Sequence, residues 1–329
     1  MSSPNNTRNI AAEYSRLLVI WNNAAGQSAA GTQARAALDQ YGQRGMQVKH
    51  RDTRSATEAS ELAAGAGRGT IVVAAGGDGT VHTVAQGLLD AVGDASKNQT
   101  EADGPPPALG VIPLGTANDF SRSLGLPEDP LRAVDALSRA EVRRLDAVRV
   151  DVDGQRQWMI NAAAGGNAAE VGHRINREQK RRWGPWCYVR GVIDVMTDLQ
   201  GYSLRVEVDD ADPMELDAYS ILLSQGRTIG SVEVASRSDL EDGQVELIVI
   251  KQAAPIETAH TAAEFFAGDY LQSEQVVYRR AECVTVFAET RMGFSIDGET
   301  TRGTAFRFTV QPASLPALVG AEYRRQPSG

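Results

Sequence analysis

The stretch TIVVAAGGDGTVH, residues 70–82, joins an apolar strand, a run of glycines and the start of a helix. Its first six residues are apolar or β-branched, which is typical of a strand buried on both faces. The glycines around Asp78 allow the main chain to approach a ligand closely, and a helix N-terminus offers unpaired N–H groups to an anion. The stretch is neither a P-loop nor GxGxxG. It predicts a phosphate site in which Asp78 holds Mg²⁺ or positions the phosphoryl donor.

A second glycine loop follows in LGVIPLGTANDF, residues 109–120. Gly115, Thr116 and Asn118 come directly after the predicted strand at 109–113. Ligands of open parallel sheets bind beyond the carboxyl ends of the strands, so we expect the two loops to face one crevice. A simpler interpretation stays open for each loop, because an Asp, Thr or Asn at these positions is also typical of a helix cap.

Outward from these loops, strands and helices alternate as far as residue 139. The predicted strands span 17–21, 46–50, 70–75 and 109–113, and the predicted helices span 33–41, 56–66, 80–92 and 131–139. A turn at Asn22, Asn23 and Gly26 follows the first strand. Alternation of this kind, with strands apolar throughout, predicts a parallel sheet covered by helices on both faces.

From residue 142 onward the pattern changes to alternation with period two. It is clearest at 147–152, 204–208, 245–250, 284–288 and 306–310, with Asp-Gly turns between such segments. This predicts an antiparallel β-sandwich or barrel, interrupted by one helix over 177–199. We therefore expect an α/β domain at 1–141 and a β domain at 142–310, with residues 311–329 left free to pack back on the first domain.

Composition limits the function classes. The 329 residues include 33 basic and 42 acidic ones, a net charge of −9, which disfavours a nucleic-acid partner. Cys187 and Cys283 form no zinc pattern and are expected to be free thiols in a reducing compartment. No secretory signal or spanning apolar run is present. The sequence predicts a cytoplasmic protein that contacts a membrane peripherally at most.

One basic and aromatic cluster, KRRWGPW at residues 180–186, stands out in this acidic chain. Lys and Arg beside Trp suit a bilayer interface. A solvated charge run that leads into a helix explains the same residues equally well, and both interpretations stay open.

Together, GGDGTVHTVAQGLL and LGVIPLGTANDFSRSLGLP resemble the diacylglycerol kinase / sphingosine kinase catalytic family, and most closely its soluble bacterial-type lipid kinases. The shorter GGDGT is shared with NAD kinases, whereas LGTANDF with its LGLP tail is similar to the lipid kinases. Residues 17–26, 161–171, 224–247 and 295–299 extend the resemblance over most of the chain. It implies an NAD-kinase-like parallel α/β domain followed by an antiparallel β-sandwich domain.

The resemblance also implies an activity, the ATP-dependent phosphorylation of a lipid hydroxyl, with ATP and Mg²⁺ as cofactors. Glu299 matches the family's proton acceptor and Asp78 is its catalytic partner. A Mg²⁺ loop corresponds to Asp239, Asp242 and Gln244, bound through Asp242 and two main-chain carbonyls. The implied nucleotide contacts are Thr53, Gly76, Gly77, Asp78, Gly79, Thr80, Val81, His82, Gly115, Thr116, Asn118 and Asp119.

Several positions depart from the family pattern: Asn23, Thr83, Ser224-Gln225-Gly226, Gly230-Ser231 and Ser236. These departures leave the lipid open among diacylglycerol, phosphatidylglycerol and sphingoid lipids. Two other hypotheses also stay open, a small-molecule kinase of the NAD kinase type and a non-catalytic lipid- or nucleotide-binding protein. The expected partner is a lipid at a membrane surface, and a homodimer is left open.

Overall fold

The computed structural model divides the chain into two compact units. It describes residues 13–43, 45–94, 104–169, 199–230, 232–254, 256–258, 260–261, 264 and 270–324. Unit 1 comprises residues 1–147, 226–243 and 311–329, and unit 2 comprises residues 148–225 and 244–310. Residues 226–243 thus group with unit 1, although the second domain expected from the sequence includes them. The physical reason is hydrogen bonding to Asp119 and Asp146 of unit 1, described below.

Unit 1 is built on a parallel sheet in the order β15-β4-β3-β1-β2. Its parallel strands are β1 (Arg16–Asn22), β2 (Gln47–Thr53), β3 (Thr70–Gly76) and β4 (Ala108–Pro113). The last strand, β15 (Glu299–Val319), joins this sheet near its end, where Ala317 pairs with Leu109. Every residue of β3 and β4 is buried, as expected for strands with both faces covered.

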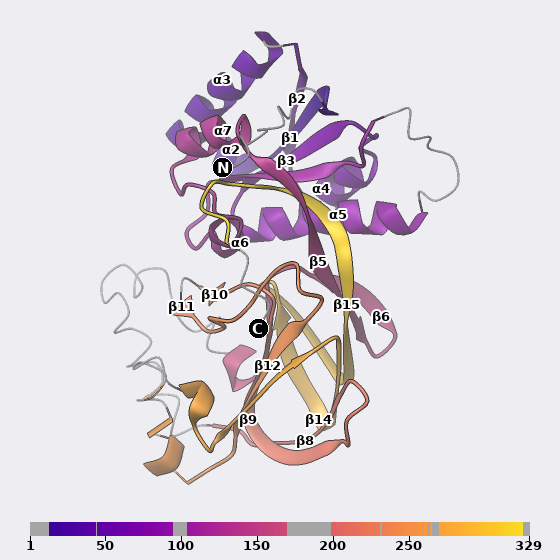
Figure 1. Cartoon of the computed structure of the whole chain (residues 1–329), viewed down its shortest axis with the longest axis vertical. Coiled ribbons are helices and arrows are strands. Elements are labelled where there is room, and N and C mark those ends of the chain that lie inside the picture. Colours follow the sequence, from indigo (N-terminus) through magenta and orange to yellow (C-terminus); the bar gives the residue numbers. More distant parts are fainter. Residues whose placement is uncertain are drawn as a thin grey trace, which may run out of the picture. The chain divides into compact units, whose positions relative to one another are not determined.

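Helices cover both faces of this sheet (Figure 1). In chain order they are α2 (Asn23–Gly26), α3 (Ala29–Gln43), α4 (Ala56–Ala64), α5 (Asp78–Asp94), α6 (Asp119–Ser123) and α7 (Pro130–Leu137). The buried side chains of α3 and α7 share a core with Val19, Trp21 and Val73, while α4 packs against α5. The short helix α2 stands where the sequence predicted a simple turn.

Unit 2 is antiparallel. Its strands are the second half of β5 (Glu141–Val152), β6 (Gln155–Met159), β7 (Ala162–Gly166), β8 (Tyr202–Val208), β9 (Met214–Ser224), β12 (Val245–Lys251), β13 (Val276–Ala281), β14 (Cys283–Ile296) and the first half of β15. Phe294 packs against Phe306 and Phe308, with ring centroids 4.5 and 5.5 Å apart. The predicted fold class is thereby confirmed.

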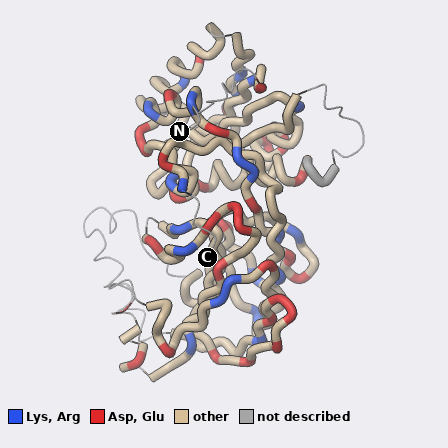
Figure 2. Tube along the Cα trace, in the orientation of Figure 1, with Lys and Arg blue, Asp and Glu red and all other residues tan. Residues whose placement is uncertain are grey.

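Two short strands and one turn of 3-10 helix are also described. β10 (Thr228–Ile229) and β11 (Val232–Glu233) form a small hairpin in unit 1, and η3 (Tyr270–Gln272) lies in unit 2. Acidic and basic residues are interspersed along the described trace of each unit (Figure 2).

Two sequence predictions fall on residues that the structure does not describe. The cluster at 180–186 and nearly all of the predicted helix at 177–199 lie outside the described residues. In the part of the chain that is described, no helix is both long and apolar enough to cross a membrane.

Candidate functional site

The two glycine loops meet main chain to main chain. A Cβ atom on Gly115 would lie 2.5 Å from Cα of Gly77, closer than real Cβ contacts allow. The Leu114 N–H also donates to the Gly76 carbonyl oxygen, at 2.8 Å. Glycine is therefore required at 115, a Cβ on Gly77 would make a tight contact of 3.1 Å with Cα of Gly115, and the loops lie together at the carboxyl ends of β3 and β4.

The glycines at 76 and 79, on either side of Asp78, differ in whether packing requires them. A Cβ on Gly76 would lie 2.3 Å from Oγ1 of Thr80, so packing excludes any side chain there. Gly79 is exposed, and a Cβ on it would meet no atom within 4 Å. The fold does not require glycine at 79, and its small size leaves open space at the N-terminus of α5, where an anion is favoured.

Asp78 connects the two loops through its carboxylate. Its Oδ1 accepts the Phe120 N–H at 3.2 Å, so the side chain lies at the start of α6. Burial raises the pKa of Asp78, the nearby charge of Asp119 raises it further, and the N–H groups of the α6 N-terminus lower it. The structure therefore contains the capping interaction left open from the sequence, but Asp78 caps α6 and not the helix that it begins.

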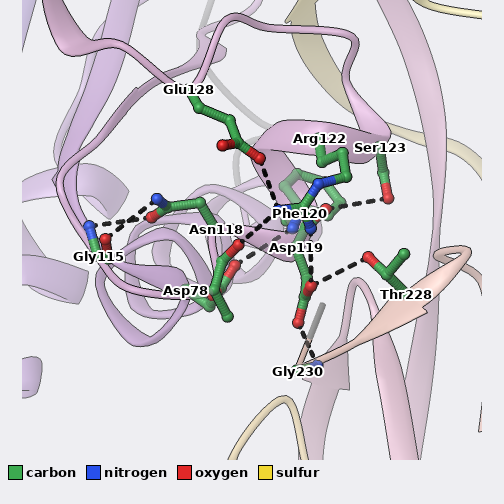
Figure 3. A network of polar contacts seen from close by, with 11 residues as sticks. Asp78, Gly115, Asn118, Asp119, Phe120, Arg122, Ser123, Glu128, Thr228 and Gly230 are labelled. Atoms are coloured by element: carbon green, nitrogen blue, oxygen red, sulfur yellow. Dashed lines mark hydrogen bonds and ion pairs between the residues drawn. The ribbon is translucent and has the colours of Figure 1, made fainter. Parts of the chain in front are cut away.

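Asn118 closes the second loop on itself. Its φ of 50° is left-handed, a conformation that Asn tolerates better than most residues. The Gly115 N–H donates to Oδ1 at 2.9 Å, and Nδ2 donates to the Gly115 carbonyl at 3.2 Å (Figure 3). The side chain makes no cap hydrogen bond to α6. Thr116 is exposed at the tip of the same loop.

Asp119 is 5% exposed, and donors from two segments surround it. Thr228 Oγ1 donates to Oδ1 at 3.0 Å, and the Gly230 N–H donates to Oδ2 at 2.6 Å (Figure 3). Arg122, one helical turn later, donates to Oδ1 at 3.1 Å. Asp119 was predicted among the nucleotide contacts, but its carboxylate is directed to protein groups and ties β10 to α6.

Several other predicted nucleotide contacts have buried side chains. Thr53 is 6% exposed and donates to the Trp21 carbonyl oxygen at 3.0 Å. Val81 and His82 are each 2% exposed, on the first turns of α5. A nucleotide at the N-terminus of α5 would meet the main chain of this segment and the half-buried Thr80 more readily than these side chains.

The predicted Mg²⁺ loop lies beside a carboxylate that the sequence analysis missed, Asp146. Its two oxygens accept the Gly243 and Ala313 N–H groups at 2.7 and 2.8 Å. Burial raises the pKa of Asp146, and the charges of Asp242 and Asp239 raise it further. The oxygen-only donors of this loop suit Mg²⁺. The described residues contain no group of three or more His, Cys, Asp or Glu able to hold a metal, so main-chain carbonyls would have to complete the site.

Glu299 lies in unit 2, at the first position of β15. It follows the Asp297-Gly298 turn, whose residues have φ angles of 47° and 93°. Its side chain is exposed, and no described residue forms a hydrogen bond or ion pair with its carboxylate. Glu299 is therefore an accessible carboxylate on a well-defined hairpin.

The sequence analysis missed four residues of these networks. Arg122 had a local signal, a cation one turn after Asp119, and Asp146 had another, an acid between the apolar residues Leu145 and Ala147. Thr228 and Gly230 had none, because they meet Asp119 from more than a hundred positions away.

Comparisons with known proteins agree with this architecture. Residues 16–150 match the model of the diacylglycerol kinase catalytic domain, and residues 161–319 match the YegS C-terminal NAD kinase beta sandwich-like domain. A Bacillus subtilis protein named diacylglycerol kinase is 29% identical over 290 residues, covering 86% of this chain and 89% of its own length. One from Staphylococcus saprophyticus is 29% identical over 230 residues, 70% of each chain.

Solved structures show the same fold. A crystal structure from Bacillus anthracis strain Sterne, provisionally assigned as a diacylglycerol kinase, superposes with a TM-score of 0.75 at 19% identity. It covers 98% of this chain and 100% of its own. A second crystal structure, described as a diacylglycerol kinase of the same strain, gives 0.67 at 16% identity, with 95% and 99% coverage. At these identities the likeness concerns the fold alone.

Proposed function

We propose that this chain, a member of the diacylglycerol kinase catalytic family, transfers the γ-phosphoryl group of ATP to a lipid hydroxyl. One observation supports this most directly: Gly79 is exposed at the N-terminus of α5 although packing does not require glycine there. A phosphate group has room to approach these main-chain N–H groups. The names of the relatives favour diacylglycerol over phosphatidylglycerol and sphingoid lipids as acceptor.

In this proposal the glycine loops position the phosphates. Phosphoryl transfer depends on positioning and charge stabilisation more than on covalent chemistry, and Mg²⁺ bound with ATP supplies part of that charge. The N-terminus of α5 provides N–H donors and a favourable dipole for the phosphates. Asp78 keeps the two loops together by capping α6, and it also places a carboxylate beside the phosphate site.

Glu299 is the proposed general base. A lipid hydroxyl is a weak nucleophile, and a carboxylate within hydrogen-bond reach accepts its proton as the new bond forms. Glu299 meets two requirements, since it is exposed and its carboxylate has no partner among the described residues. The proposal requires that it reach the acceptor hydroxyl while ATP is bound.

The loop of Asp239, Asp242 and Gln244 is proposed to hold a second Mg²⁺, separate from the one bound with ATP. Burial is the main cause of the raised pKa of Asp146, and the nearby charges of Asp242 and Asp239 raise it further. Carboxylates clustered in this way gain from a cation between them, which supports the proposal. Contact with a lipid also requires a peripheral encounter with a membrane. Residues 180–186 are one candidate for this contact, and the alternative of a solvated charge run stays open.

The test is an acceptor panel. Purified protein would be mixed with radiolabelled ATP and, separately, with diacylglycerol, phosphatidylglycerol or sphingosine in mixed micelles, with NAD, or with water. Transfer to one lipid, strongly reduced by Glu299→Gln, is the expected result. Transfer to NAD alone would support a kinase of the NAD kinase type. ATP binding without transfer would support the non-catalytic hypothesis.

A further inference from the structure

The turn before Glu299 holds a second carboxylate, Asp297, whose two oxygens are both occupied. Oδ1 accepts the N–H groups of Asn161 and Ala162 at 3.0 and 2.9 Å, and Oδ2 accepts that of Ile160 at 2.7 Å. The Asp297 N–H donates to the Ala162 carbonyl at 2.9 Å. Four hydrogen bonds therefore fix this turn to the segment that joins β6 to β7.

This attachment determines where β15 begins, and therefore where Glu299 lies. Ile296 pairs with Glu299 across the two-residue turn, and both turn residues have positive φ, the geometry of a tight hairpin. Asp tolerates the left-handed conformation, and its short side chain reaches the three neighbouring N–H groups. A shift of Asp297 would move the main chain of Glu299, which is two residues away.

The same arrangement occurs twice more in unit 2, at turns with no proposed role in catalysis. Asp153 has a φ of 45°, and the N–H groups of Thr304 and Ala305 donate to its carboxylate. Asp209 has a φ of 47° and accepts the N–H groups of Glu282 and Cys283. At Asp153 these donors hold the pKa below its usual value. A left-handed Asp that caps a neighbouring strand is thus a structural device of this unit.

We infer that Asp297 is a positioning residue, which holds the Glu299 hairpin in place and does not itself take the substrate proton. The inference rests on the proposed function, in which Glu299 is the base. It follows from the geometry, because the Asp297 oxygens are directed to three main-chain N–H groups whereas the Glu299 carboxylate is exposed.

Two substitutions separate positioning from proton transfer. Asp297→Asn keeps an oxygen that accepts the N–H groups of Asn161 and Ala162. Asp297→Gly places at this position a residue that adopts the turn conformation freely, but it removes every side-chain hydrogen bond. Neither Asn nor Gly offers a group that accepts a proton at neutral pH. Positioning predicts a graded loss of kcat, less than tenfold for Asn and about 10²-fold for Gly, since small misplacements are costly. If Asp297 were the base, both substitutions would lower kcat by the same large factor, and that result would overturn the inference.

The pH profile provides a second readout. If Glu299 is the base, the acidic limb of the kcat profile persists in Asp297→Asn and disappears from the residual activity of Glu299→Gln. Loss of that limb in Asp297→Asn would overturn the inference. Asp209→Gly is the matched control, since it removes the same device from another turn, and its kcat should equal that of the wild type.

A measurement without substrate keeps this test independent of the lipid assay. Amide hydrogen exchange of the full chain should accelerate at residues 160–162 and at Glu299 in Asp297→Gly, and near residues 282–283 in Asp209→Gly. If the wild type phosphorylates no lipid while Glu299 exchange accelerates, the proposed function fails and Asp297 still positions the hairpin. Unchanged exchange at Glu299 would overturn the inference whatever the activity.

Discussion

The acids of the two glycine loops and the acid at the start of β15 have opposite surroundings. In unit 1, Asp78 accepts the Phe120 N–H, and Asp119 accepts Thr228, Gly230 and Arg122. In unit 2, Glu299 is exposed and its carboxylate has no partner among the described residues, while the neighbouring Asp297 accepts three N–H groups.

The difference separates carboxylates that organise the chain from one that is available for chemistry. A buried acid must be hydrogen-bonded to offset its desolvation, and its lone pairs are then directed to the protein. An exposed acid on a rigid hairpin retains lone pairs for a substrate. Substitution of Asp119 should therefore lower stability, whereas substitution of Glu299 should lower kcat.

The largest expected effect is at Glu299. Glu299→Gln retains the size of the side chain but cannot accept a proton, so kcat should fall by ~10² to 10⁴. The KM for ATP should change little, because the proton moves only as the transition state forms. Steady-state kinetics with saturating lipid, together with a thermal melt, measure both.

Glu289→Gln is the matched control, an exposed glutamate on the neighbouring strand β14. It should leave both kcat and the melting temperature unchanged. Near-normal kcat in Glu299→Gln would remove the contrast between the two classes of acid, and the proton would then have another acceptor.

The architecture was predictable because hydrophobic periodicity is local. The run at 70–75 and the alternation at 204–208 each correspond to a strand of the expected type. The continuity of the last strand was less accessible. The β domain expected from the sequence ends at 310, with residues 311–329 left free to pack on the first domain, and the two units divide between Val310 and Gln311. That one strand of 21 residues, β15, runs through this division was not predicted.

The site was predictable only where its chemistry is encoded by neighbouring residues. The glycine loops were recognisable because Gly76, Gly77 and Asp78 are consecutive, and the meeting of Gly77 with Gly115 follows from parallel strands. The contacts of Asp119 with Thr228 and Gly230 depend on tertiary pairing, which a local sequence pattern does not reveal. The family resemblance placed Asp119 among the nucleotide contacts, and the local sequence contains no sign of these hydrogen bonds.

The next effect in size is at Asp119. In Asp119→Asn an amide N–H₂ group takes the place of one carboxylate oxygen. That oxygen accepts a hydrogen bond in the wild type, so its buried donor loses a partner in the variant. The free energy of unfolding should fall by about 1.5–3 kcal/mol, the range for hydrogen bonds to charged groups. Thr228→Val removes one neutral donor and should cost about 1 kcal/mol. Urea denaturation measures both.

Asp135→Asn provides the control for Asp119, because it breaks an exposed ion pair with Arg139 one helical turn away. Exposed pairs of this kind contribute about 0.3–0.5 kcal/mol, so the change should be barely measurable. An equally small effect at Asp119 would mean that its contacts to β10 do not stabilise the chain.

A smaller effect is expected from Mg²⁺ at the loop of Asp239 and Asp242. The pKa of Asp146 is raised in the folded chain, so its contribution to stability is present at low pH and is lost as the pH rises through that pKa. A cation opposes this loss. Mg²⁺ at ten times its Kd should stabilise by about 1.4 kcal/mol at pH 7.5, and by less at pH 5, where protons compete.

Thermal melts with and without Mg²⁺ at the two pH values test this expectation. Asp242→Asn should abolish the increment, whereas Asp210→Asn, on an exposed turn of unit 2, should retain it. An increment that persists in Asp242→Asn would place the cation elsewhere.

The smallest effect on stability, and the sharpest test of the phosphate loop, is at Gly79. A Cβ there meets no atom within 4 Å, and Ala is favoured over Gly in a helix, so Gly79→Ala should stabilise the chain by up to about 1 kcal/mol. If phosphate approaches at this point, the same methyl group should raise the KM for ATP. Gly77→Ala is the contrasting variant, since its Cβ would lie 3.1 Å from Gly115 and should lower stability. The melting temperature and the KM for ATP, measured for both variants, test this expectation. If Gly79→Ala raises the melting temperature with no change in KM, the open space beside Gly79 is not where the nucleotide binds.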